Sequence, residues 1–347
     1  MKNYFYTFII LHLLSCKSAL SQSSQAQIVC IGFYNLENLF DTERDTSILD
    51  EEFTPQGAKE WTLDKYNAKL ANLSMVIGDL GKPNCPDGPV LLGVSEVENK
   101  KVLEDLLRQK ELLNSGYQIL HYDSKDARGI DVALLYKPKY FKILASQSIP
   151  VFLVDSVNGS KFTRSVLLVK GSLAGQTIYI TVNHWPSRRS GVATSKPYRN
   201  QLALLNYHLF DSIRSIESDP AFMVIGDLND NPTDASVRVT LKAQAEAKYV
   251  DSSSFYNPFY KTYKNGEGSL EFNHTWSLFD QIILSFGLVN NKSTNFTYYQ
   301  HQIYHKEFMI EQTGHNKNNP KRSFNGDTWN NGFSDHFPSL VYLIRNK

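Results

Sequence analysis

Short apolar runs, each long enough for one β-strand and each closed by turn residues, recur along most of this 347-residue chain. Roughly ten such runs occur, whereas helical spacing is confined to three segments. Strands that outnumber helices in this way are typical of two sheets packed face to face with helices outside. The expected strands are Ile28–Tyr34, Pro89–Val94, Tyr117–His121, Val132–Tyr136, Ile149–Val154, Ser165–Val169, Thr177–Val182, Ala221–Ile225, Gln281–Leu284 and Ser339–Leu343, and the expected helices are Thr62–Leu80, Lys101–Leu113 and Lys196–Ser215.

Composition supports one large folded domain and excludes several functional classes. With 41% hydrophobic residues the chain is too apolar to be disordered. Its 36 basic and 35 acidic residues give a net charge of +1, so the molecule as a whole does not attract nucleic acid or anionic membrane. A polyanion must therefore be bound by a local patch or through a metal. The 3 cysteines are too few for a disulfide scaffold and lack zinc-type spacing.

The first 21 residues predict an export signal, because an apolar stretch too short to span a bilayer follows Lys2 and precedes a run of small residues. Two processing routes are open: cleavage after Ser21, or acylation of Cys16, since Leu13-Leu14-Ser15-Cys16 resembles a bacterial lipobox. We expect residues 27–347 to form the mature domain, either secreted, periplasmic or tethered to the outer membrane through lipidated Cys16.

Polar side chains follow the expected strands at the points where they end. Because loops converge at one end of such strands, carboxylates, amides and imidazoles placed there can form one site. Each residue taken alone is also an ordinary cap or turn residue. Together they offer the oxygen ligands, the base and the phosphate donors of a metal-assisted phosphodiester cleavage. The residues are Asn35, Glu96, His184, Asp227, Asn229, Asp280, Asp335 and His336.

Seven short motifs contain or flank these residues. In order along the chain they are Asn35-Leu36-Glu37-Asn38-Leu39-Phe40, Ser95-Glu96-Val97-Glu98, Arg128-Gly129-Ile130-Asp131-Val132-Ala133, Val182-Asn183-His184-Trp185-Pro186, Ile225-Gly226-Asp227-Leu228-Asn229-Asp230, Phe279-Asp280-Gln281-Ile282 and Phe333-Ser334-Asp335-His336-Phe337-Pro338. With these motifs the chain resembles the endonuclease/exonuclease/phosphatase superfamily, which includes deoxyribonuclease I-like nucleases, abasic-site endonucleases, neutral sphingomyelinases and inositol polyphosphate 5-phosphatases. The resemblance implies a four-layer α/β sandwich and a Mg²⁺- or Mn²⁺-dependent phosphoesterase.

The resemblance also implies a role for each position. Glu96 would be the main metal ligand, with Asn35 and Asp335 near the same ion. His336 would be the base for the attacking water, and Asp280 would orient its imidazole.

The remaining positions would surround the phosphate. Asp227 and Asn229 would position the nucleophile and bind the phosphoryl oxygens, while His184 would donate to the transition state or the leaving group. Asp126 or Asp131 is a candidate carboxylate partner for His184, and a turn role is equally open for both. Arg164 and Arg188 are candidate substrate-binding residues.

The motif residues would contact the phosphate and not the group attached to it, so several substrate classes remain open. An extracellular endonuclease is the first expectation, with local bases contacting phosphates and Tyr298, Tyr299, Tyr304 and Trp329 stacking on bases. A phospholipid or small phosphoester hydrolase is the alternative, and a non-catalytic binding module is a third. Residues 256–276 and 290–332 are expected to be long functional loops. No protein partner is implied, and we expect a monomer.

Overall fold

The computed structural model describes residues 26–154, 159–189, 191–290 and 294–346. The predicted export signal, with Cys16, lies outside the described residues. Within those ranges no helix is long and apolar enough to cross a membrane.

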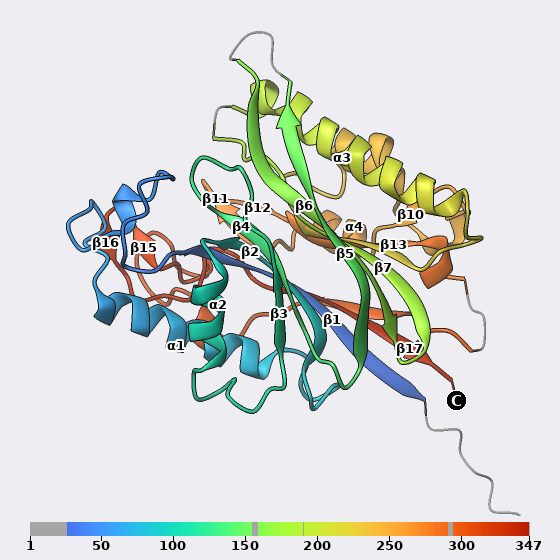
Figure 1. Cartoon of the computed structure of the whole chain (residues 1–347), viewed down its shortest axis with the longest axis horizontal. Coiled ribbons are helices and arrows are strands. Elements are labelled where there is room, and N and C mark those ends of the chain that lie inside the picture. Colours follow the sequence, from blue (N-terminus) through green and yellow to red (C-terminus); the bar gives the residue numbers. More distant parts are fainter. Residues whose placement is uncertain (1–25, 155–158, 190, 291–293, 347) are drawn as a thin grey trace, which may run out of the picture.

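Two mixed β-sheets form the centre of the molecule (Figure 1). In the first sheet the strands run in the order β14 (Thr297–Ile303), β17 (Ser339–Arg345), β1 (Gln27–Leu39), β2 (Pro89–Val97), β4 (Asp131–Tyr136) and β3 (Gln118–His121). In the second the order is β5 (Phe141–Leu153), β6 (Lys161–Leu173), β7 (Gln176–His184), β8 (Phe222–Asp227), β13 (Asp280–Ser285), β10 (Phe255–Tyr256) and β9 (Ala243–Gln244). Two small hairpins complete the strands: β11 (Leu270–Phe272) with β12 (Thr275–Ser277), and β15 (Phe324–Asn325) with β16 (Thr328–Trp329).

Helices cover the outer faces of the sheets and make the sandwich four layers deep (Figure 1). The pair α1 (Leu63–Asp79) and α2 (Lys100–Leu107) lies outside the first sheet, and α3 (Val192–Arg214) lies outside the second. A short helix, α4 (Phe259–Lys264), follows β10. The helix α1 begins where predicted, because the Thr62 side chain accepts from the Lys65 amide. This arrangement is the α/β sandwich expected from the sequence.

The core has two parts that correspond to the spaces between these layers. One fills the space between the sheets and under α1 and α2. At Gly93 on β2 a Cβ atom would come within 2.7 Å of the Ile225 side chain, so the absence of a side chain lets the sheets approach. The other part lies between the second sheet and α3, where the rings of Phe210 and Phe222 pack edge to face 5.6 Å apart. Each fully buried ring contributes roughly 1.5–3 kcal/mol.

Parallel pairing brings four strand ends to one edge of the sandwich. β1 runs parallel to β2, and β7 runs parallel to β8 in the register His184↔Asp227. The antiparallel strand β13 begins at the same edge, because Asp280 pairs with Asp227. The polar residues that end these strands therefore meet, as the sequence predicts.

Four expectations from the sequence were wrong in detail. Residues 290–332 are not only loop, since β14 pairs with β17 at the edge of the first sheet; its polar Gln and His residues hide the strand pattern because an edge strand is half exposed. Residues 256–276 likewise contain α4 and β11. The helix predicted over Lys101–Leu113 ends at Leu107, and α3 begins four residues before Lys196.

Candidate active site

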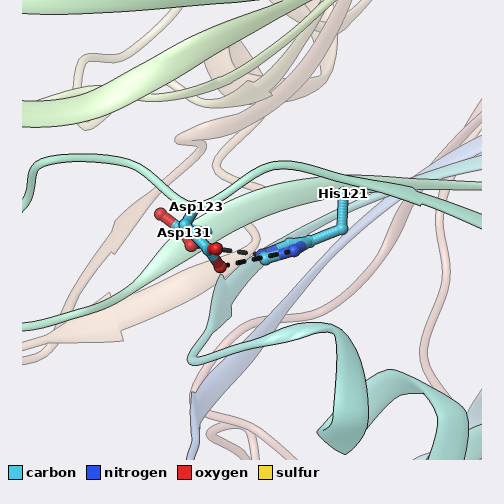
Figure 2. Close-up of side chains that lie close together, drawn as sticks. All are labelled: His121, Asp123 and Asp131. Atoms are coloured by element: carbon cyan, nitrogen blue, oxygen red, sulfur yellow. Dashed lines mark hydrogen bonds and ion pairs between the residues drawn. The ribbon is translucent and has the colours of Figure 1, made fainter.

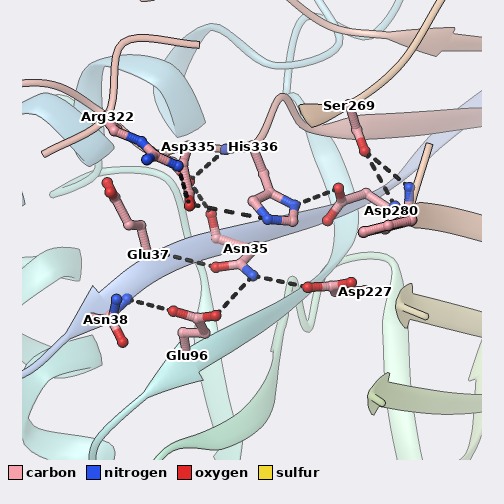
Figure 3. Close-up of polar contacts among 12 residues, drawn as sticks. Asn35, Glu37, Asn38, Glu96, Asp227, Ser269, Asp280, Arg322, Asp335 and His336 are labelled. Carbon is pink, nitrogen blue, oxygen red and sulfur yellow. Dashed lines mark hydrogen bonds and ion pairs between the residues drawn. The ribbon is translucent and has the colours of Figure 1, made fainter. Parts of the chain in front are cut away.

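Seven of the eight strand-end residues form a continuous group of contacting side chains at this edge, and Figure 3 labels all of them except His184. β1 and β2 supply two of them, β7, β8 and β13 supply three, and the turn before β17 supplies the last two. The group contains Asn35, Glu96, His184, Asp227, Asp280, Asp335 and His336, and all the contacts that link it are 4.8 Å or shorter.

Asn35 connects the two sheets within this group. Its amide nitrogen donates to Glu96 Oε1 at 3.2 Å and to Asp227 Oδ2 at 3.1 Å (Figure 3). Its oxygen accepts from the backbone amide of Glu37 at 2.8 Å. Asn35 thus fixes the direction of both carboxylates. As the predicted metal ligand, Asn35 would use the second lone pair of its side-chain oxygen.

Glu96 owes its orientation to an irregularity in β2. The pairing of β2 with β4 shifts register between Ser95 and Val97, and Glu96 has a left-handed φ of 60°. A bulge of this kind turns a side chain away from the regular alternation of a strand. The Asn38 amide then donates to Glu96 Oε2 at 2.9 Å, so both oxygens have a fixed place. Such strain in a non-glycine residue is typical of functional positions.

His336 and Asp280 form a buried pair. His336 Nδ1 lies 2.6 Å from Asp280 Oδ2, and neither residue is more than 7% exposed. Since an ionised carboxylate only accepts, Nδ1 carries a proton, and in the neutral form of the ring the lone pair lies on Nε2. Burial disfavours the imidazolium, but the negative charge of Asp280, with Asp335 and Asp227, outweighs it and raises the pKa of His336 well above the usual value.

His184 faces the carboxylates from the second sheet. Its Nε2 lies 3.6 Å from Asp227 Oδ2 and 3.8 Å from Glu96 Oε1, and its Nδ1 is buried without a hydrogen-bond partner. Burial, with the positive charges of Arg164 and Arg128, lowers the pKa of His184 well below its usual value, so the ring is neutral at pH 7. Burial also raises the pKa of Asp227 to about 7.

Two further predicted residues, Asn229 and Arg164, meet at the Trp185 carbonyl beside this group. The Asn229 amide donates to Asp227 Oδ1 at 2.9 Å, while its side chain donates to the Trp185 carbonyl at 3.0 Å. Arg164 is buried and donates to the same carbonyl at 2.8 Å, with Asp126 Oδ2 3.4 Å away; its Nε has no partner.

Arg188, in the loop after β7, is held by residues of the loop after β8. It donates to the Asn229 carbonyl at 2.7 Å and pairs with Asp230 at 2.7 Å and Asp234 at 2.5 Å. The structure therefore places Arg188 as a support for the turn that carries Asn229. Its predicted part in substrate binding would require these ion pairs to open.

Neither Asp126 nor Asp131 is the carboxylate partner of His184, and the turn role left open for Asp126 is confirmed, because its side chain accepts from the Arg128 backbone amide at 3.0 Å. Asp126 pairs with Arg164, and Asp131 pairs with His121, whose Nε2 lies 3.1 Å from Asp131 Oδ2 (Figure 2). These ligand atoms and those of Asp123 lie within 4.8 Å of one another, but the Asp123 side chain is 87% exposed. The carboxylates nearest His184 are instead Asp227, which the parallel register of β7 and β8 places alongside it, and Glu96, which reaches it from β2 of the other sheet.

Several supporting residues were not singled out from the sequence. Ser334 donates to the Asn35 carbonyl at 2.7 Å and accepts from the His336 amide, which fixes the turn before β17. Arg322 pairs with Asp335 at 2.9 Å (Figure 3). Buried Lys69 pairs with Glu37 at 3.3 Å. The sequence offered a signal for only two of these residues: Glu37 lies in the Asn-Leu-Glu-Asn motif and Ser334 in the Ser-Asp-His motif.

The charge of the group suits a divalent cation. Four carboxylates lie together, and the raised pKa of Asp227 reflects their burial and mutual repulsion. Glu96 and Asp335 keep 16% and 27% of their side chains exposed, so an ion from solvent can reach them. Asp227, Asp280 and His336 also have metal-like spacing, but two of these are engaged with each other at 2.6 Å. The donors are mainly oxygens, as Mg²⁺ and Mn²⁺ prefer.

Comparison with known sequences decides the family. The sequence model of the endonuclease/exonuclease/phosphatase family matches residues 30–345. The chain belongs to this family. Its members hydrolyse phosphoester bonds, and the residues assembled at the sheet edge lie in the motifs that indicated the family from the sequence. No curated protein matches the sequence significantly.

Solved structures of other family members share the fold. A family protein from Bacteroides thetaiotaomicron has 15% identity and a TM-score of 0.55, over 93% of this chain and 100% of that one. A mannosyl-6-phosphatase from the same organism has 14% identity and a TM-score of 0.55, over 91% and 99%. Truncated Caenorhabditis elegans TDP2 has 15% identity and a TM-score of 0.52, over 91% and 97%.

Proposed function

We propose that this chain is an exported, divalent-metal-dependent hydrolase in which His336 activates a water molecule to attack a phosphoester. The observation that carries the proposal is the buried Asp280–His336 pair directly beside the cluster of carboxylates. Glu96 and Asp335 would hold the ion, with Asn35 orienting Glu96. When bound, Mg²⁺ or Mn²⁺ supplies positive charge that polarises the phosphate and offsets its repulsion by the carboxylates.

The side chains of the chain itself account for the proton transfer. In the neutral form of His336, Nε2 takes the proton from water, and Asp280 stabilises the imidazolium that results. His184, neutral because it is buried, donates a hydrogen bond to a phosphoryl or leaving-group oxygen. Asp227 and Asn229 hold the water and the phosphate in position, since the left-handed turn at Asn229 fixes its side chain against the Trp185 carbonyl.

Two substrate classes fit this chemistry, and the described residues favour a small phosphoester. The arginines expected to track a phosphate backbone are engaged, Arg164 by burial and Arg188 by two aspartates. Of the aromatic side chains expected to stack on bases, Tyr304 is buried and Trp329 packs against Trp61 at 5.7 Å. The similarity in fold to a mannosyl-6-phosphatase agrees with this choice.

A nucleic-acid phosphodiester is the second candidate. Tyr299 on the edge strand β14 is 51% exposed and open to a base. The fold is also similar to that of Danio rerio TDP2, which has been solved with a single-strand DNA product.

The experiment is a substrate panel with the purified protein. It is assayed with Mg²⁺ or Mn²⁺ against sugar phosphates, plasmid DNA, RNA, sphingomyelin and a phosphoinositide, alongside His336→Ala. We expect turnover of a small phosphoester by the wild type and a loss of at least about 10²-fold in the variant. Equal turnover by both proteins would refute the assignment of the base, and preferential cleavage of plasmid DNA would select the second candidate.

A further inference from the structure

A polar pocket opens directly beside the candidate active site. Its volume is about 170 Å³. Two residues belong both to its wall and to the site: Asp335, whose Oδ1 lies 3.9 Å from His336 Nε2, and Arg322, which pairs with Asp335 (Figure 3). A group attached to a phosphate at His336 can therefore enter this pocket.

The pocket is built from two segments far apart in the sequence. The β11–β12 hairpin contributes Glu271 and Phe272, and residues 311–325 contribute the opposite wall. The segments are joined by a hydrogen bond from Asn319 to Glu271 and by contact of the His274 and His315 rings, whose centroids are 4.7 Å apart. The second oxygen of Glu271 is buried without a hydrogen-bond partner.

The polar groups of the wall match hydroxyls. A hydroxyl both donates and accepts, so it is best bound by carboxylates that accept together with amides that do both. The wall offers Glu271 and Glu311 as acceptors, and Asn273 and Asn316 as amides. Phe272, 69% exposed, adds an aromatic face to this polar wall, against which the apolar side of a ring can pack.

The charges and donors of the pocket wall argue against two other ligands, a second phosphate and a cationic headgroup. Glu271, Glu311 and Asp335 outnumber Arg322, which is already paired, so a second phosphate of a nucleic-acid strand would be repelled. A cationic headgroup would satisfy the carboxylates, but it has no acceptor for the amide and guanidinium donors that share the wall. A neutral group with several hydroxyls satisfies both kinds of wall residue.

We propose that this pocket binds the sugar of a monosaccharide phosphate and makes the enzyme selective for that class. The inference rests on the proposed function and names its substrate. Binding the sugar here places the attached phosphate next to His336, so hydroxyl contacts in the pocket lower KM for substrates that can make them.

The test compares glucose 6-phosphate with n-hexyl phosphate, which has the same number of carbons but no hydroxyls. The ratio of their kcat/KM values should be at least about tenfold in the wild type, which is what one or two well-placed hydrogen bonds supply. Asn316→Ala should lower this ratio severalfold through KM for glucose 6-phosphate, whereas Phe272→Ala should raise KM for both substrates. The control Asn67→Ala, an exposed residue of α1, should leave the ratio unchanged.

Other outcomes distinguish failure of the sugar-binding pocket from failure of the proposed phosphoesterase function. A ratio near one in the wild type, or a preference for phosphocholine or a DNA oligonucleotide, would overturn the sugar assignment while leaving the phosphoesterase intact. Saturation-transfer NMR with methyl glucoside reads binding without turnover, and its signal should disappear in Phe272→Ala. If no phosphoester is hydrolysed but this signal is present, the proposed function fails and the pocket assignment stands. Absence of the signal in the wild type would contradict the pocket.

Discussion

Replacing Asp280 by asparagine tests the catalytic pair with little change in shape. The carboxylate lies 2.6 Å from His336 Nδ1 and is completely buried, and its other oxygen has no hydrogen-bond partner. Asp280→Asn therefore removes the negative charge and puts an amide in place of the carboxylate beside Nδ1. The asparagine amide can donate to Nδ1, which would move the imidazole proton to Nε2 and occupy the lone pair that must accept from water.

The expected loss follows from this burial. Breaking a buried, hydrogen-bonded charge pair costs about 3–5 kcal/mol, which corresponds to about 10²–10⁴-fold in rate if the pair acts in the transition state. Because Asp280 acts only through His336, the double variant Asp280→Asn/His336→Ala should be no slower than His336→Ala alone. The assay is kcat on a hydrolysed phosphoester, measured for the folded fraction determined by circular dichroism.

Asp131→Asn is the matched control, because Asp131 makes the equivalent hydrogen bond to His121 outside the site (Figure 2). It should change stability but leave kcat within about threefold of the wild type. If the double variant lost the product of the two single losses, Asp280 and His336 would act independently and the reasoning would be refuted.

Three further predictions concern groups around the site and in the sheet. Lys69→Met leaves Glu37 buried without its partner, so the free energy of unfolding measured in urea should fall by about 3–5 kcal/mol; an unchanged midpoint would show that the pair is not formed. Burial lowers the pKa of His301 to about 4, so on acidification the unfolded chain takes up a proton first. The contribution of His301 to stability should therefore fall by up to about 3 kcal/mol between about pH 6.5 and 4, so the stability of His301→Gln should depend less on pH than that of the wild type by this amount. Arg188→Gln should lower the free energy of unfolding by about 1–3 kcal/mol with little change in KM, because Arg188 is paired with Asp230 and Asp234; a raised KM at unchanged stability would contradict that placement.

The fold and the meeting of the strand ends could be predicted from local patterns. Buried strands such as β8 are continuous apolar runs, so their ends and the polar residues that follow were visible in the sequence. The edge strand β14 was missed because half of it faces solvent and its pattern is that of a loop.

Contacts that depend on turn conformation could not be predicted. Whether Arg188 meets a phosphate or Asp230 is decided by the loop after β8, and whether Asp131 meets His184 or His121 is decided by the pairing of β3 with β4. The pocket beside Asp335 is formed by two irregular segments about 40 residues apart, and no local periodicity indicates their contact.

Removing and restoring the divalent ion tests the central claim most directly. The purified protein is treated with a chelator, assayed, and then titrated with Mg²⁺ or Mn²⁺ in parallel with Glu96→Ala, while binding of Mn²⁺ is followed by calorimetry. We predict that chelation lowers activity by about 10²-fold or more, that either ion restores it, and that Glu96→Ala binds Mn²⁺ more weakly and stays inactive. Full activity of Glu96→Ala in the presence of chelator would contradict the account.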